Sequence, residues 1–227
     1  MKKENRKENS IIAIIAILTL VFQIVIPIIP GIQTEVLATN ETNTEEQITN
    51  EQEKNTTEEI SRNYEIKEEE TWDISEKGDG SITAKWTLKD RTLTISGNGI
   101  MKDWPYGMSN EDWHNTKYTN VIEKVIINEG ITNIGNNAFD KCINLTDVKI
   151  AEDVISIGES AFYNCNKLTN ITIPEGVTNI GRYAFNGCSS LSNITIPERV
   201  TKIEFATFSN CTNLKEIIIP EGVTSIE

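Results

Sequence analysis

The chain has 227 residues, with 34 acidic and 21 basic side chains and a net charge of −13. This charge argues against nucleic acid as a partner, because binding to phosphate groups needs clustered Lys and Arg. The single histidine, His114, excludes His-based metal clusters and makes any Ser-His or Cys-His catalytic pair depend on one position.

Residues 1–38 have the pattern of a secretory signal peptide. Basic residues precede an apolar run over 11–26, and a Val-Leu-Ala sequence ending at Ala38 has the small residues that a signal peptidase recognises. The alternative is an uncleaved membrane anchor, because the run approaches the roughly 20 residues needed to span a bilayer. Two prolines near its end favour cleavage, with a mature N-terminus at Thr39. Both interpretations predict export, with membrane contact only through this segment if it stays uncleaved.

Residues 39–70 are predicted to form a disordered acidic linker. The segment is mainly Thr, Asn, Gln and Glu, and residues 41–70 hold eleven Glu against three basic residues, a local charge of −8. Such a composition cannot bury enough apolar surface to offset the entropy lost on folding. Two interpretations stay open: a spacer that lifts the folded part off a surface, and a plain low-complexity linker.

Residues 71–121 are predicted to form a small β-rich N-terminal cap. Two segments with period-two alternation, 82–88 and 91–97, are joined by Lys89-Asp90, which is typical of a β-hairpin. A repeat array needs an atypical first unit to cover its core. Large aromatic side chains fill cores more often than they stack on sugar rings, so we expect the tryptophans of this segment to pack inside the cap. These are Trp72, Trp86, Trp104 and Trp113.

From residue 122 onward the sequence repeats every 23 residues, in four full copies and a truncated fifth. The copies run 122–144, 145–167, 168–190, 191–213 and 214–227. Columns of identical apolar residues keep this step: Ile134, Ile157, Ile180, Ile203 and Ile226; Phe139, Phe162, Phe185 and Phe208; Cys142, Cys165, Cys188 and Cys211; Leu145, Leu168, Leu191 and Leu214. Such a period predicts a tandem repeat architecture.

Each copy divides into a strand half and a turn half. In the third copy, apolar and polar residues alternate over 168–173, which predicts a short strand that ends at Pro174, where no N–H is available. Ala184-Phe185 predicts one helical or 3₁₀ turn with a small and a large apolar residue facing inward. No copy can bury its apolar face alone, so the sequence predicts a β-rich solenoid of stacked 23-residue units.

The third copy, "IPEGVTNIGRYAFNGC" over 173–188, resembles the BspA-like leucine-rich repeats of bacterial and protist surface proteins. The resemblance covers 122–227, and the residues before it, "WTL…TLTISG", resemble the module that often precedes such repeats. It implies an exported, adhesin-like binding protein with a leucine-rich repeat fold. Some positions depart from the pattern without breaking the register: Asp153, Arg199, Glu204 and Thr207.

The four cysteines are predicted to be free thiols. An even number of Cys in an exported chain suggests disulfides. However, one Cys falls in each copy, in the same inward column as the neighbouring Phe, and side chains stacked in one direction do not easily reach disulfide geometry. We therefore expect four buried thiols that react slowly.

No catalytic, metal or cofactor site is predicted, and the chain is not expected to be an enzyme. The sequence contains no G-x-S-x-G, P-loop or H-E-x-x-H motif. A calcium-loop-like segment starting at Asp73 fails, since Lys77 and Ala84 stand where oxygen ligands belong. A binding surface is expected instead on the outward strand positions, with an extracellular protein or glycan as partner. Its candidate residues are Lys149, Asn170, Thr172, Asn193 and Thr195.

Three functions remain open at this point: a surface protein that binds host or neighbouring-cell proteins, a binding or spacer region of a larger secreted enzyme, and a structural coat component. The fifth copy ends at Glu227, before its Phe and Cys positions. We expect the natural chain to continue beyond this residue, or the exposed end to pair with another chain.

Overall fold

The computed structural model describes residues 58–59, 61, 66–106, 113–114 and 116–227. The predicted signal peptide and most of the predicted linker lie outside these residues. The chain divides into two units, 1–50 and 51–227, and only the second contains described residues. Among the described residues, no helix has the length and apolar character needed to cross a membrane.

The second unit begins with an antiparallel meander of three strands, β1 (Glu69–Asp73), β2 (Ile82–Thr87) and β3 (Thr92–Gly97). The predicted hairpin is therefore confirmed. It turns through four residues that include Arg91 with a φ of 47°. Packing begins ahead of residue 71, where the cap was predicted to start, because Ile66 is 3% exposed and joins the core. A short helix, α3 (Thr116–Thr119), precedes the repeats.

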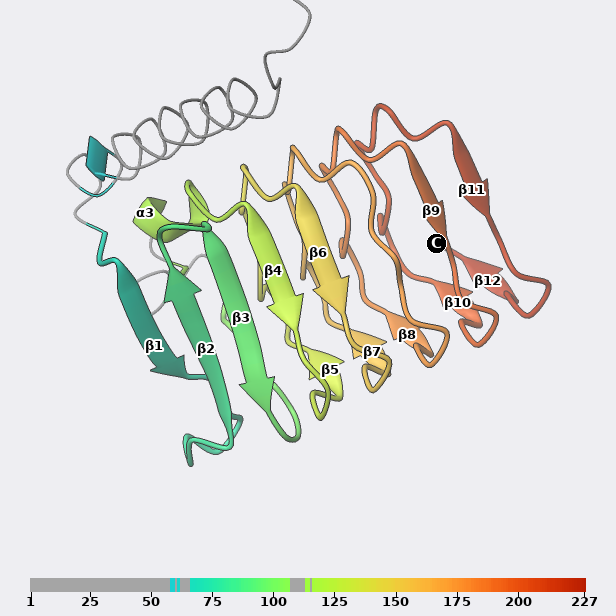
Figure 1. The fold of residues 1–227 in the computed structure, drawn as a ribbon. Helices are drawn as coiled ribbons and strands as arrows, with labels where there is room; N and C mark the ends of the chain where they lie inside the picture. The colour runs from blue at the N-terminus through green and yellow to red at the C-terminus, as the bar shows by residue number, and fades with distance from the viewer. Residues whose placement is uncertain (1–57, 60, 62–65, 107–112, 115) are drawn as a thin grey trace, which may run out of the picture. The chain divides into compact units, whose positions relative to one another are not determined.

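The cap and the array share one sheet. β3 pairs in parallel with β4 (Lys124–Ile127), and β4 pairs in parallel with β6 (Asp147–Ile150), which gives the order β1-β2-β3-β4-β6 (Figure 1). Alternate residues are buried on β4, and also on β3 from Leu93 to Ser96, as period-two alternation requires. The cap therefore covers the array by supplying a strand to the array's own sheet.

The repeats form a solenoid, whose 23-residue copies we call coils 1 to 5 in chain order. Each coil also carries a two-residue strand in its turn half: β5 (Asn133–Ile134), β7 (Ser156–Ile157), β8 (Asn179–Ile180), β10 (Lys202–Ile203) and β12 (Ser225–Ile226). Coils 4 and 5 add β9 (Asn193–Thr195) and β11 (Glu216–Ile218). Parallel pairs join β5 to β7, β7 to β8, β9 to β11 and β10 to β12. The predicted fold class is confirmed.

The strand predicted over 168–173 is not formed. Residues 169–173 keep the expected burial, with Ile171 and Ile173 inside and Thr172 exposed, but they make no strand ladder. Among the described residues, the main-chain bond from Ser192 to the carbonyl of Thr169 is what joins this stretch to coil 4. Burial of the side chains therefore sets the path of this stretch, and the five-stranded sheet ends at β6.

At Ala184-Phe185 the predicted turn half is present as hydrogen-bonded turns, with no helix or 3₁₀-helix, and the reason lies in the backbone. Each of coils 1 to 4 holds two residues with φ between 54° and 77°, and the left-handed conformation of such residues interrupts a right-handed helix. Seven of these eight residues are not glycine. They are Asn137, Lys141, Ser160, Asn164, Tyr183, Gly187, Ala206 and Asn210.

These turn segments are joined by their own series of main-chain hydrogen bonds. In coil 1 the N–H groups of Asn137, Phe139 and Lys141 donate to carbonyls 22 residues later in coil 2, over 2.7–2.8 Å. The same three bonds recur from coil 2 to coil 3 and from coil 3 to coil 4. The left-handed residues thus direct alternate amides toward the neighbouring coil, so buried turn backbone is satisfied without a helix.

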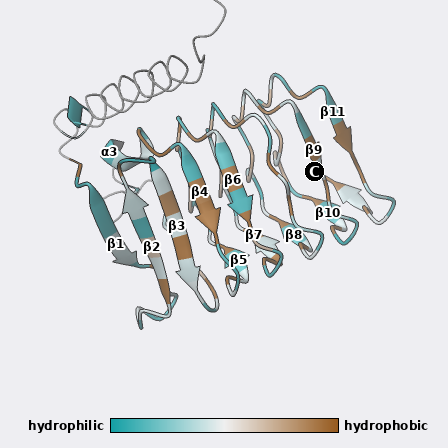
Figure 2. Cartoon of the chain, in the orientation of Figure 1, coloured by the Kyte–Doolittle hydropathy of each residue, from teal (hydrophilic) through white to brown (hydrophobic). Residues whose placement is uncertain are grey.

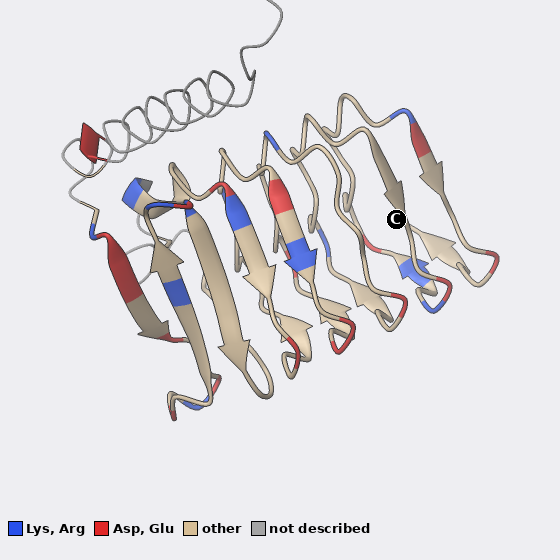
Figure 3. Cartoon of the chain, viewed as in Figure 1, with Lys and Arg blue, Asp and Glu red and all other residues tan. Residues whose placement is uncertain are grey.

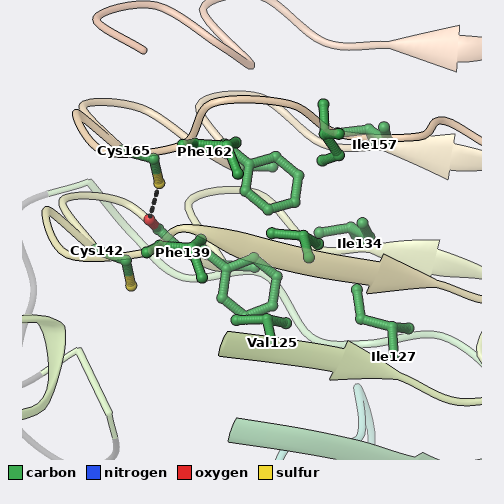
Figure 4. Packing of buried hydrophobic residues seen from close by; sticks show 14 of the residues in the cluster. Val125, Ile127, Ile134, Phe139, Cys142, Ile157, Phe162 and Cys165 are labelled. Atoms are coloured by element: carbon green, nitrogen blue, oxygen red, sulfur yellow. Dashed lines mark hydrogen bonds between the residues drawn. The ribbon is translucent and has the colours of Figure 1, made fainter. Parts of the chain in front are cut away.

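The core is a set of stacked columns. Phe139, Phe162, Phe185 and Phe208 lie ring on ring, with centroids 5.3–5.7 Å apart and neighbouring planes within 23° of each other. Figure 4 shows the first pair, Phe139 and Phe162. The first three rings are fully buried, and so are Ile157, Val154 and the Ala beside each of these rings. Because each side chain contacts its own equivalents one coil away, every coil interface resembles the next.

Trp113 closes the aromatic column at the cap. Its ring stacks on Phe139 with a centroid distance of 6.3 Å, and its Nε1–H donates to the carbonyl of Ala138 over 2.8 Å. The equivalent carbonyls of Ala161 and Ala184 accept the main-chain N–H of a Phe from the preceding coil, also over 2.8 Å. The indole therefore replaces both the ring and the N–H of the coil that is missing before coil 1.

The cysteines form the expected inward column of free thiols. Cys142, Cys165 and Cys188 are fully buried, while Cys211 is partly exposed. The Sγ of Cys165 donates to the carbonyl of Phe139 over 3.3 Å (Figure 4), and the same contact recurs in the next two coils. Burial raises the pKa of each thiol, and the rise is smallest for Cys211, to about 11.

We therefore expect thiol titration of the folded protein to detect Cys211 first and the other three only after denaturation. The thiolate is the reactive form, and burial both suppresses ionisation and blocks the reagent. The measurement is reaction with a chromogenic disulfide reagent, with and without denaturant, and Cys211→Ser removes the fast phase. Fewer than four thiols in denaturant without reductant would contradict a free column.

Candidate functional site

All five predicted binding residues are exposed on the outward strand positions of coils 2 to 4, which we call the strand face. Lys149 lies on β6, and Asn193 and Thr195 flank the buried Ile194 on β9. Asn170 and Thr172 are exposed in the same order in coil 3, although no ladder fixes them there. The structure therefore presents these side chains as the alternation predicted, and their role in binding stays a proposal.

The centre of the strand face carries no charge. Asp147 and Lys149 on β6 mark one side and Glu216 on β11 the other, and the outward side chains between them are the Asn and Thr residues of coils 3 and 4 (Figure 3). Coloured by hydropathy, β6 at the border of this strip carries hydrophilic residues, whereas the neighbouring β4 ends in hydrophobic ones (Figure 2). This surface offers hydrogen-bond donors and acceptors at equivalent positions of adjacent coils, without a net field.

The two Asn side chains of this strip are held in the same way. The Nδ2 of Asn170 donates to the hydroxyl of Thr169 over 3.3 Å, and that of Asn193 to the hydroxyl of Ser192 over 3.2 Å. The hydroxyl of Ser192 in turn donates to the carbonyl of Thr169 over 3.2 Å. The amides are therefore oriented by their own coils before any partner arrives, which lowers the entropy lost on binding.

A surface hollow of about 560 Å³ adjoins Lys149, where β4 and β6 end. Its lining combines apolar side chains with charged ones. The lining residues are Ile127, Asn128, Glu129, Lys149, Ile150, Ala151, Glu152 and Asp153. The hollow extends the strand face toward the turns and adds carboxylates to an otherwise neutral surface.

Sequence reasoning did not include these carboxylates, although a signal for them was present. A Glu follows the first strand half of every coil at the 23-residue step, and all five are exposed. They are Glu129, Glu152, Glu175, Glu198 and Glu221. This acidic column has the same 23-residue period as the apolar columns of the core.

The tryptophans of the cap are core residues. Trp86 and Trp113 are fully buried, Trp104 is 6% exposed, and Trp72 packs by its edge on Trp113 and on Tyr118. The alternative of a sugar-stacking platform around Trp104 and Trp113 is therefore excluded by burial.

His114 and Asp73 have structural roles. His114 stacks on Trp104 with a centroid distance of 4.6 Å, and its Nε2 lies 2.9 Å from the carbonyl of Asn137. Asp73 accepts hydrogen bonds from Ser75 and Gly80, and those bonds lower the pKa of its carboxyl. Among the described residues, no three His, Cys, Asp or Glu side chains converge as a metal site would require.

Asp140 is a mostly buried charged residue near the cap. Burial raises the pKa of this carboxyl, and its Oδ1 has no hydrogen-bond partner. Its Oδ2 lies 3.4 Å from the Nζ of Lys141. Lys141 and His114 act electrostatically on this carboxyl, and among the described residues it joins no group of three His, Cys, Asp or Glu side chains.

Comparison with known proteins agrees with this geometry. The family described as BspA type leucine-rich repeat region matches residues 115–227 in six copies. A leucine-rich repeat protein from Eubacterium ventriosum is 34% identical, with a TM-score of 0.59, over 70% of this chain and 40% of that protein. A leucine-rich cell surface protein from Faecalibacterium prausnitzii is 34% identical, with a TM-score of 0.47, over 65% of this chain and 43% of that one.

The chain thus spans less than half the length of these solved relatives. No curated protein matches it. The 23-residue step and the parallel strand ladders are features that the matched repeats share with a leucine-rich solenoid. Through residues 115–227, the chain belongs to the family of BspA-type leucine-rich repeat proteins.

Proposed function

We propose that the protein is exported to the cell surface and binds an extracellular partner protein through the strand face, without catalysis. The observation that carries this proposal is the neutral strip formed by Asn170, Thr172, Asn193 and Thr195, exposed in matching positions on adjacent coils. The Faecalibacterium relative is a leucine-rich cell surface protein, which supports the location. The basic and apolar start of the chain supports export.

The strip fits a protein surface for physical reasons. Proteins of the repeat class use their extended face to contact partners over many coils. Exposed amide and hydroxyl groups make hydrogen bonds that do not require a partner of one charge. The flanking Lys149 and Glu216 can then add electrostatic selectivity at the rim, where charges mainly alter association rates.

Replacing Thr172 and Thr195 with Glu should abolish partner binding while leaving the fold intact. Both side chains are exposed, and exposed substitutions usually change stability by about 0.5 kcal/mol or less. The change adds two charges and extra bulk to the centre of the neutral strip. Binding is measured to immobilised fibronectin and collagen and to whole cultured cells, with circular dichroism as the folding check.

A matched control places the same change off the strand face. Thr178→Glu with Thr201→Glu alters two exposed threonines on the same two coils, ahead of β8 and β10, and should leave binding unchanged. Equal binding by the strand-face variant and the wild type would remove the strand face as the site. No binding by the wild type to any of these surfaces would remove the adhesin function.

A further inference from the structure

A second surface feature lies away from the strand face, in the turn segments of coils 3 and 4. Arg182 and Tyr183 follow β8, and Phe205 follows β10. The rings of Tyr183 and Phe205 meet edge to face with centroids 5.5 Å apart, and the guanidinium carbon of Arg182 lies 5.6 Å from the centroid of the Phe205 ring. We call these three residues the aromatic–arginine cluster.

The solenoid does not need aromatic residues at these positions. The column that holds Arg182 and Phe205 has Asn136 in coil 1 and Glu159 in coil 2. The column of Tyr183 has Asn137, Ser160 and Ala206 in the other coils, and the backbone conformation is the same in each. Residues without a ring therefore satisfy the fold, and the aromatic pair is an addition specific to coils 3 and 4.

The cluster is held at a conformational cost. Tyr183 has a φ of 57°, a left-handed conformation that bulky side chains rarely adopt, whereas Asn tolerates it. Its N–H is fixed by donation to the carbonyl of Phe205 over 3.1 Å. The solenoid fixes this backbone conformation at every equivalent position, so what coil 3 adds is the choice of Tyr at a position that disfavours it.

The cluster also presents a cation at the surface. Phe205 is 45% exposed, and Arg182 is exposed. Among the described residues, no ion pair is found for Arg182, although its charge contributes to lowering the pKa of the Glu227 carboxyl. The nearby Lys202 is paired with Glu204 and Glu227 over 2.8–3.1 Å. In a protein of charge −13, an arginine stacked on an exposed ring is available to an anion from outside.

We propose that the aromatic–arginine cluster binds a carboxylated sugar residue, of the hexuronate class, within a glycan. The planar guanidinium of Arg182 matches a carboxylate with two parallel hydrogen bonds, and its stacking on Phe205 holds it in place. The apolar C–H face of the pyranose would pack on the exposed surface of the Phe205 ring, beside the edge-to-face contact with Tyr183. This site is separate from the strand face and does not depend on it.

The test uses a tetrasaccharide of alternating glucuronate and N-acetylhexosamine, with its carboxyl-reduced form as the matched ligand. Calorimetric titration of the full chain should show binding of the acidic form, and the reduced form should bind about tenfold more weakly, the loss of one charge-assisted pair. Arg182→Asn and Phe205→Asn should each weaken binding to a similar degree, because both introduce the residue that coil 1 carries at this position.

Tyr183→Asn separates binding from strain. Asn occupies the equivalent left-handed position in coil 1, so this variant should be at least as stable as the wild type while it binds the sugar more weakly. The strand-face variant with Thr172→Glu and Thr195→Glu should bind the tetrasaccharide as the wild type does. Loss of sugar binding in that variant would overturn the assignment to the cluster.

Two other results would overturn the proposal. One is binding of the acidic and reduced tetrasaccharides with equal affinity, which would show that Arg182 does not read a carboxylate. The other is binding of an acidic peptide together with no heat of binding from the tetrasaccharide. That result would assign the cluster to a protein ligand. Melting curves of all variants confirm that the fold is retained.

Discussion

Replacing Phe162 with Ala should lower the free energy of unfolding by about 3–5 kcal/mol, the range for deleting a fully buried aromatic side chain. Phe162 lies between Phe139 and Phe185, with centroids 5.3 and 5.4 Å away, so its loss opens a cavity at two coil interfaces. A solenoid is stabilised mainly by contacts between neighbouring coils, so both interfaces weaken together. Urea unfolding followed by circular dichroism measures the change.

The control is the same substitution at an exposed ring. Phe205→Ala removes a side chain that is 45% exposed and outside the stacked column, and it should cost about 1 kcal/mol or less. Similar losses for Phe162→Ala and Phe205→Ala would contradict a stabilising role for the column. A larger loss at Phe162 alone would support it.

Replacing Trp113 should be nearly as costly, although this residue precedes the repeats. Trp113→Ala removes both the stacked ring and the N–H that satisfies the carbonyl of Ala138, and should cost about 3–5 kcal/mol. Trp113→Phe keeps most of the ring and leaves that carbonyl without its donor, and should cost about 1–3 kcal/mol. Denaturant midpoints of the two variants separate the ring from the hydrogen bond.

Trp72→Phe provides the matched control for the second change. Trp72 is only partly buried, and among the described residues no hydrogen bond is found for its indole N–H. This variant should lose less than about 1 kcal/mol. If Trp72→Phe and Trp113→Phe were equally destabilising, the donation to Ala138 would not be what holds the cap to coil 1.

The inside of the solenoid could be predicted because it repeats. A residue such as Phe162 contacts its own equivalents one coil away, so the residues 23 positions before and after it in the sequence are also its core neighbours. The exposure of Thr172 and Thr195 followed from the same alternation. The free state of Cys165 followed from its column, since the structure places its Sγ against a carbonyl of the preceding coil.

The turn backbone could not be predicted from residue type. Lys141 and Tyr183 adopt left-handed conformations that their side chains disfavour, because the hydrogen bonds to the next coil fix the amide direction at every equivalent position. The missing strand at 168–173 was equally hidden. Its residues have strand character, and ladder formation depends on the neighbouring coils.

The surface features depend on differences between coils and were therefore beyond a periodicity argument. The hollow beside Lys149 forms between the ends of β4 and β6, and the contact of Arg182 with Phe205 joins one column across two coils that carry different residues. The role of Trp113 was hidden for a related reason. Trp113 precedes Ala138 by 25 residues, a spacing that does not match the 23-residue step, so the repeat pattern did not pair them.

The gaps between the strand ladders have a mechanical consequence. Coils 1 and 2 are joined by two ladders, coils 2 and 3 by one, and coils 4 and 5 by two, whereas none joins coil 3 to coil 4 among the described residues. Between these two coils the turn-segment bonds and the stacking of Phe185 on Phe208 carry the load. A pulling force along the solenoid axis acts on all interfaces in series, so the array should part first between coils 3 and 4, at the plane that the contact of Tyr183 with Phe205 bridges.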